Sequence, residues 1–246
     1  MAFQFGYSNL VVSNGSTSNN VNMTADWIVV ADGAWNTLRI PMTSTITIDK
    51  SSTTQTSTMV NGRDQAATFP VSTWIYIWAI YNPVTNTIAG LFSLSATAPT
   101  LPSGYTHKAW VGAVYSAVTT GNFVSFHQTD NRVVVPTSSP GNTNATTLTG
   151  ITVADGTVSY CPNSAKTIAG WIYCSSTTAN AYRAITIACS SATDSLGSSD
   201  TSGALGGAGT STFGCLFNLP LIGTQLFVKA NNADTNVTIF ISGWGY

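Results

Sequence analysis

The stretch WIYIWAIYNP, residues 74–83, decides the fold class of this chain. Successive side chains of a β-strand point to opposite faces, so Trp74, Tyr76 and Trp78 share one face and the isoleucines between them the other. A strand with one face in water alternates apolar and polar residues, whereas this stretch is apolar on both faces. The pattern predicts a strand that is covered on both sides, by its own chain or by a neighbouring subunit.

The composition of the whole chain extends this prediction. The 246 residues are 43% hydrophobic and include no glutamate, while serine, threonine, asparagine and glycine are abundant. Strong helix formers are scarce, and β-branched and turn-forming residues favour strands and tight connections. We therefore predict an all-β fold, with a chain long enough for one large or two ordinary domains.

Turn residues divide the chain into predicted strands. TSTITID (residues 43–49) alternates as a half-buried strand, and NPVTN (residues 82–86) predicts a hairpin that returns as TIAGLFSL. In the second half, QLFVKANNADTNVTIFISGWGY (residues 225–246) predicts a final hairpin with NNADTN as its turn. The glycine- and serine-rich residues 190–212 predict a long loop.

A change of composition near the middle predicts a domain boundary. VVVPTSSPGNTNATT, residues 133–147, combines two prolines with Ser, Gly, Asn and Thr, which predicts an irregular linker without regular structure. The interpretation is two β-sandwich or jelly-roll-like domains joined by this linker, residues 1–137 and 138–246.

The charge content limits the partners. Only 7% of the residues are charged, eight Lys and Arg against nine Asp, and the cations are spread from Arg39 to Lys229 without forming a basic patch. Nucleic acid is therefore not expected as a ligand. A neutral polar surface is expected where neighbouring molecules cover much of it in an assembly. The alternative is a monomer whose surface is neutral.

The sequence shows no targeting or membrane-spanning pattern. MAFQFGYSNL, residues 1–10, has neither the basic nor the apolar region of a signal peptide, and no apolar run reaches the roughly 18 residues of a membrane helix. We expect the chain to be made in a cytosol-like compartment and to stay soluble, without membrane insertion.

The search for catalytic chemistry finds no constellation. His107 and His127 stand alone, so no metal site is expected. Most aspartates lie close to Gly or Asn in the sequence, as Asp32, Asp64, Asp155 and Asp234 do. This context favours a role in turns over a role in the catalytic carboxylate pair of a glycosidase. LGGAG, residues 205–209, lacks a Walker lysine. The chain is expected to be no enzyme and to use no cofactor and no metal.

The four cysteines, all in the second half, leave two interpretations open. Their spacing contains no C-x-x-C pair and no histidine nearby, which argues against zinc. Buried free thiols are one interpretation, and disulfides formed after release into an oxidising medium are the other. The residues concerned are Cys161, Cys174, Cys189 and Cys215.

Aromatic residues supply the candidate binding positions. Trp110 and Trp171 alternate with apolar residues, as core residues do. Trp35 in DGAWNT and Trp244 in SGWGY sit among turn residues and are the candidates for an exposed glycan contact. If the residue 74–83 strand is covered only in an oligomer, then Trp74, Tyr76 and Trp78 form an assembly surface.

Three stretches in the first half of the sequence carry a family resemblance: VNMTADWIVVADGAWNTLRIP, WIYIWAIYNPVTNTIAGLFSLSATAPTLPSGYTHKAWVGAVYS and GNFVSFHQTDNRV. They resemble a segment that recurs in virion proteins of tailed bacteriophages, of the tail-fibre and head-decoration types. The likeness covers roughly the first 135 residues and is strongest over residues 20–135, and the last 30 residues are loosely similar to terminal hairpins of such proteins.

The resemblance implies a function but no catalytic residues. It implies a non-enzymatic virion structural protein, an external accessory such as a head decoration protein or a short fibre that docks on capsid or tail proteins. It also implies a homo-oligomer, with a trimer as the expected state. A receptor-binding module that grips surface glycan is the alternative, and a capsular polysaccharide depolymerase is the third hypothesis. Whether the chain sits on head or tail is left open.

Overall fold

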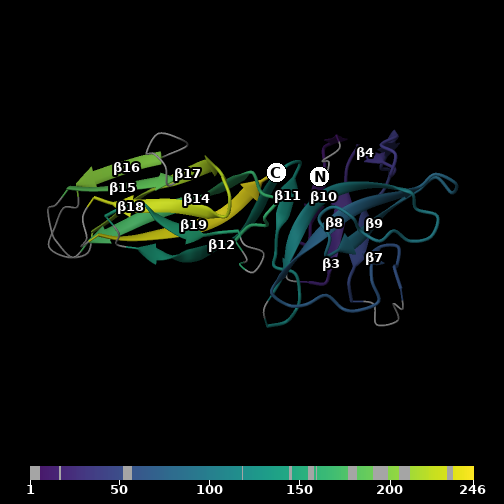
Figure 1. Cartoon of the computed structure of the whole chain (residues 1–246), viewed down its shortest axis with the longest axis horizontal. Coiled ribbons are helices and arrows are strands. Elements are labelled where there is room, and N and C mark those ends of the chain that lie inside the picture. The colour runs from purple at the N-terminus through teal and green to yellow at the C-terminus, as the bar shows by residue number, and fades with distance from the viewer. Residues whose placement is uncertain are drawn as a thin grey trace. The chain divides into compact units, whose positions relative to one another are not determined.

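The computed structural model describes residues 6–16, 18–51, 57–117, 119–143, 146–154, 158, 160–176, 182–190, 199–204, 211–231 and 235–246. Within these residues every regular element is a β-strand, as the composition predicts, and none is a helix. The chain divides into two compact units, Met1–Val135 (unit 1) and Pro136–Tyr246 (unit 2), whose strands are labelled in Figure 1. Each unit is described separately.

The first sheet of unit 1 is built around the tryptophan strand. β8 is flanked on both edges, by β10 and by β9, and the turn at residues 83–86 joins β8 to β9 as the predicted hairpin. The strand order is β1-β4-β10-β8-β9-β7, with β5 paired to β4, and all pairs are antiparallel except β7 with β9. Its strands are β1 (Tyr7–Ser8), β4 (Trp27–Ala31), β5 (Thr37–Pro41), β7 (Gly62–Arg63), β8 (Thr73–Asn82), β9 (Thr87–Ser93) and β10 (His107–Ser116).

A second layer in unit 1 is formed by shorter strands. They are neighbours in the order β12-β11-β2-β3-β6, and Ile46 and Ile48 of β6 are buried, as the alternation of TSTITID predicts. The strands are β2 (Val11–Ser13), β3 (Asn20–Thr24), β6 (Ile46–Asp49), β11 (His127–Thr129) and β12 (Arg132–Thr143).

The two layers of unit 1 approach each other most closely at glycines. A Cβ at Gly90 of β9 would lie 2.3 Å from side-chain atoms of Ile48, and one at Gly112 of β10 would lie 2.3 Å from Gln128 Oε1. Only glycine leaves room there for the opposite layer. Ile75 and Ile77 of β8 are fully buried on this inner face, which accounts for one apolar side of the strand.

The other side of β8 is covered by a segment of the same chain. Trp78 Nε1 donates a hydrogen bond of 3.2 Å to the carbonyl oxygen of Ser95, in the proline-rich stretch that follows β9. Pro99 and Pro102 of that stretch are buried, and Lys108 Nζ lies 5.5 Å from the Trp78 ring centroid. Segments of the same chain therefore cover both faces of β8.

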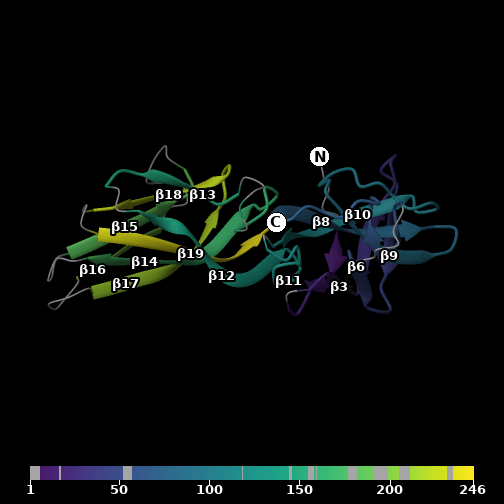
Figure 2. The ribbon, with the colours of Figure 1, turned by 90° about the horizontal axis from the view of Figure 1, so that it is seen from below.

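Unit 2 contains two further strand groups. One has the order β17-β14-β19, with β12 next to β19, and the other has the order β13-β18-β15-β16. Figure 1 shows β14 beside β19, and Figure 2 shows β13 and β18 on the other side of the unit. The strands are β13 (Thr149–Thr152), β14 (Thr167–Ser176), β15 (Tyr182–Ala188), β16 (Ser199–Ala204), β17 (Ser211–Pro220), β18 (Gln225–Ala230) and β19 (Thr235–Gly245).

The predicted final hairpin is wrong. β18 and β19 follow each other in sequence, but β18 pairs with β13 and β15 whereas β19 pairs with β14. The turn residues between the two strands therefore connect two sheets instead of two neighbouring strands. The predicted loop at residues 190–212 also contains a strand, β16, which pairs with β15.

The predicted irregular linker is wrong as well, because β12 runs through Pro136 and Pro140. Residues four apart direct their backbone groups to the same edge of a strand, so the two missing N–H groups fall on one edge. The residues between the prolines still donate toward the other edge, which allows the strand to continue. The LGGAG run lies outside the described residues.

Candidate functional site

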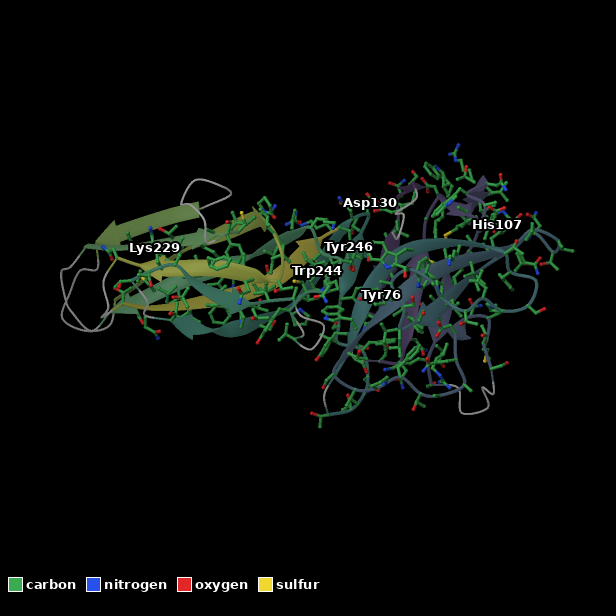
Figure 3. All side chains as sticks on the ribbon, in the orientation of Figure 1. Tyr76, His107, Asp130, Lys229, Trp244 and Tyr246 are labelled. Atoms are coloured by element: carbon green, nitrogen blue, oxygen red, sulfur yellow. The ribbon has the colours of Figure 1, made fainter. Side chains whose placement is uncertain are left out.

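The tryptophan strand is largely buried within the single chain. Trp74 and Trp78 are only 4% and 3% exposed, and the Trp74 ring meets Tyr115 edge-on with centroids 5.2 Å apart. Tyr76, labelled in Figure 3, is half-buried, and its burial raises the pKa of its hydroxyl. Tyr76 is thus the member of this trio with surface to offer a partner, and an assembly role for the strand stays a prediction.

Trp35 is held out on a tightly bonded turn. Its side chain is 59% exposed, which confirms the expected exposure. Asp32 Oδ1 accepts hydrogen bonds of 2.9 Å from the backbone N–H groups of Ala34 and Asn36, and Oδ2 accepts one of 2.8 Å from Asn36 Nδ2. The bond from the Asn36 side chain is the main cause that lowers the pKa of Asp32.

The backbone of this turn is conformationally costly. Trp35 has a φ of 70°, in the left-handed region that bulky residues avoid. Asp32 stabilises the turn in this conformation, because its carboxylate accepts the N–H groups on either side of Trp35. Strain at a bulky exposed residue motivates a functional hypothesis for this position.

The two other exposure predictions are reversed by the structure. Trp244 is only 3% exposed, because β19 continues through Gly245 and pairs Trp244 with Ile168. Figure 3 labels Trp244 close to the end of this strand. Trp171, which the alternation assigned to the core, is 36% exposed. The polar neighbours of Trp244 indicated a turn. In the structure Trp244 lies in a strand, and the pairing of this strand with β14 buries it.

An exposed aromatic cluster of unit 2 surrounds Trp171. Its ring stacks on Phe240 with centroids 4.1 Å apart and an angle of 8°, and Tyr173 lies nearly parallel to both at 5.7 and 5.8 Å. Leu216, opposite Trp171 on β17, is 81% exposed. We call the outward side of β14, β17 and β19 with these four residues the aromatic face.

The sequence contained a signal for this face. TIAGWIYC places Trp171 and Tyr173 on the same side of a strand, opposite Ile172 and Cys174. Both inner residues are buried, and Val237, Ile239 and Ile241 of β19 are buried as their alternation predicts. The outer position of Phe240 among polar neighbours was likewise visible in the sequence. What the sequence did not show is that β14 and β19 are adjacent.

Two cations lie close together inside unit 1. Lys50 Nζ donates hydrogen bonds to the carbonyl oxygen of Gly121 and to Ser116 Oγ, at 3.3 Å for the hydroxyl, and lies 4.2 Å from the Phe123 ring centroid. Arg63 is fully buried and donates to the carbonyl oxygen of Lys50. Burial first, and the charge of Arg63 second, lower the pKa of Lys50 to about 8. These contacts tie the end of β6 to the turn after β10.

The two histidines and Asp32 form hydrogen bonds with residues close to them in the sequence. His107 is buried with Nδ1 2.9 Å from Thr106 Oγ1, and the exposed His127 has Nε2 3.3 Å from Thr129 Oγ1. Asp32 takes the turn position that its sequence context predicts. Among the residues that the structure describes, no group of three or more His, Cys, Asp or Glu could hold a metal ion.

The three described cysteines carry thiols that are in no disulfide. Cys161, Cys174 and Cys189 are buried, which confirms the first of the two interpretations for these three. Cys161 Sγ donates to the carbonyl oxygen of Val153 at 3.3 Å, and burial raises its pKa to about 12. The side chain of Cys215 lies outside the described residues.

Comparison with known proteins adds no relative. No protein-family model and no curated protein matches the chain. Among the described residues, no helix is long and apolar enough to cross a membrane.

Proposed function

We propose that this chain is a non-enzymatic structural protein of a tailed-bacteriophage virion. It acts as an external accessory, such as a head decoration protein or a short fibre, that docks on capsid or tail proteins. The observation that carries the proposal is the aromatic face, which presents Trp171, Phe240 and Leu216 in a chain with only 7% charged residues. Apolar rings held outward on a rigid sheet support a role in assembly.

The proposed partners are further copies of this chain, with a trimer as the expected state, and the major capsid or tail proteins. Nucleic acid and membranes are not among them. Attachment rests on burial of apolar surface, worth about 25 cal/mol per Å² removed from water. An interface of standard size, about 1,600 Å² in total, provides enough of this term for stable attachment after the entropy of association is subtracted.

Electron microscopy of particles tests the proposal directly. Virions assembled without this chain are incubated with the purified protein, washed and imaged beside untreated virions. We expect extra density at symmetry-related positions of the head or tail. Particles that bind none of the protein at micromolar concentration would contradict the virion assignment.

A second candidate function, binding of a surface glycan, rests on Trp35. An exposed indole on a rigid turn, next to the carboxylate of Asp32 and the amide of Asn36, offers a ring face and hydrogen-bonding groups together. A glycan array or binding to whole cells tests it. Trp35→Ala should abolish binding, while the exposed control Val84→Ala on the β8–β9 turn should keep it. Equal binding by both variants would exclude Trp35 as the contact.

A further inference from the structure

Unit 2 separates its charges by sheet. β13, β18, β15 and β16 carry the charged residues of the unit's strands, namely Arg183, Asp200 and Lys229. β14, β17 and β19 contain no charged residue, and neither do residues 136–143 of β12, which lies next to β19. One sheet of the unit therefore carries all the charged residues of its strands, and the strands of the other sheet carry none.

Among the described residues, the uncharged side also exposes large apolar groups. Leu216 and Trp171 face outward from directly paired positions, and Phe240 continues the row on the next strand. Interface cores lack charge and are enriched in aromatic residues, so the two observations agree on the same face. Lys166, exposed one residue before β14, places a charge at the rim, as protein interfaces do.

We infer that the aromatic face of unit 2 packs against a second copy of this chain. The inference rests on the proposed homo-oligomeric structural function and assigns its contact surface. Two copies of a surface without charges meet without like-charge repulsion, whereas a charged partner would leave its own charges unpaired there. The closed stack of Trp171 on Phe240 argues against a sugar, because Phe240 already occupies one face of the indole.

The size of the face suits such a contact. β14 and β17 have ten residues each, which at about 3.3 Å per residue gives strands about 33 Å long. Three such strands about 4.8 Å apart, together with the eight residues 136–143 of β12 beside β19, give a projected area of about 600 Å² per copy. Two copies would then bury about 1,200 Å², at the lower end of the range of specific interfaces.

Light scattering coupled to size-exclusion chromatography tests the inference on the full chain. The wild-type protein should elute as a multiple of the 25.7 kDa chain mass. Leu216→Lys puts a charge on the face at a side chain already in water, so the fold tolerates it, and the dissociation constant should rise at least tenfold. The matched control Val84→Lys, at an exposed turn of unit 1, should leave the mass unchanged.

Two variants that each remove one aromatic ring supply a second comparison of the two sheets. Phe240→Ser removes a ring from the aromatic face, and Phe227→Ser removes a half-buried ring from β18 on the charged sheet. We expect dissociation for Phe240→Ser and none for Phe227→Ser, with circular dichroism showing both folded. Should Phe240→Ser unfold, the Leu216→Lys comparison decides the matter alone.

The outcomes separate the inference from the proposed function. An oligomeric wild type whose mass is unchanged by Leu216→Lys overturns the assigned face and leaves the homo-oligomer standing. A wild type that stays monomeric at all concentrations overturns both. Dissociation by Val84→Lys or Phe227→Ser as readily as by the face variants also overturns the assignment, because the effect would not be local.

Discussion

Replacing Gly90 by alanine should separate the two layers of unit 1 at their closest approach. The new Cβ would lie 2.3 Å from both Cδ1 and Cγ1 of Ile48, and 3.3 Å from Cγ2 of Ile46. Carbon atoms in contact prefer about 3.5–4.0 Å, so Ile48 must move by more than about 1 Å. Ile48 is fully buried, and overpacking of this kind costs about 1–3 kcal/mol of unfolding free energy.

A double-mutant cycle isolates this clash. Ile48→Ala alone should cost about 2–5 kcal/mol through lost burial and a cavity. In the double variant the alanine Cβ of position 90 enters the space that Ile48 vacated, so the clash disappears. The double variant should therefore be no less stable than Ile48→Ala, with a coupling energy of about 1–3 kcal/mol.

Urea unfolding followed by tryptophan fluorescence measures these energies. Five of the seven tryptophans lie within residues 1–135, so the signal reports mainly on unit 1. Gly33→Ala is the matched control, because a Cβ there meets nothing within 4 Å, and its effect should stay within about 0.5 kcal/mol. Additive effects of Gly90→Ala and Ile48→Ala within about 0.5 kcal/mol would refute the proposed packing of the two layers.

Three further predictions concern single side chains. The folded pKa of Lys50, about 8, lies below its ordinary value of 10.5, so the unfolded state binds more protons between these values and stability rises with pH there. Because the side chain is only half-buried, the gain should be about 1 kcal/mol between pH 7 and 10 relative to Lys50→Met, and a flat difference would contradict it. Cys161 should resist alkylation at pH 8 until urea unfolds the chain, as peptide mass spectrometry would show, and rapid native labelling would refute its burial. Trp35→Gly should raise the unfolding free energy by about 0.5–1 kcal/mol, because glycine accepts the φ of 70°, and a loss of stability in calorimetry would mean that the indole makes stabilising contacts.

Local patterns were sufficient for features that lie within one strand or one turn. Alternation located β6 and the buried face of β19, and the Asn-Pro turn located the β8–β9 hairpin. Turn chemistry identified the role of Asp32 and the exposure of Trp35. In each case the deciding pattern is formed by residues close in sequence, so the residue types themselves carry the information.

The misassigned positions depend on distant partners. Trp244 looked like a turn residue, yet pairing with Ile168 of β14 buries it. β18 and β19 looked like a hairpin, yet each finds its partners in a different sheet. Pro136 and Pro140 looked like linker residues, yet β12 includes both. Composition cannot reveal these outcomes, because strand pairing is set by which edges remain available after the whole chain has folded.

The sequence by itself determined that the chain is all-β, that it carries little charge and that the strand at residues 74–83 needs cover on two faces. The tertiary structure decided what provides the cover: the opposite layer at Ile48 on one side, and the chain near Ser95 on the other. It also decided that Trp171 and Phe240 lie together on an outer face. The physical reason is that periodicity fixes the direction of a side chain along its own strand, whereas contact across strands depends on topology.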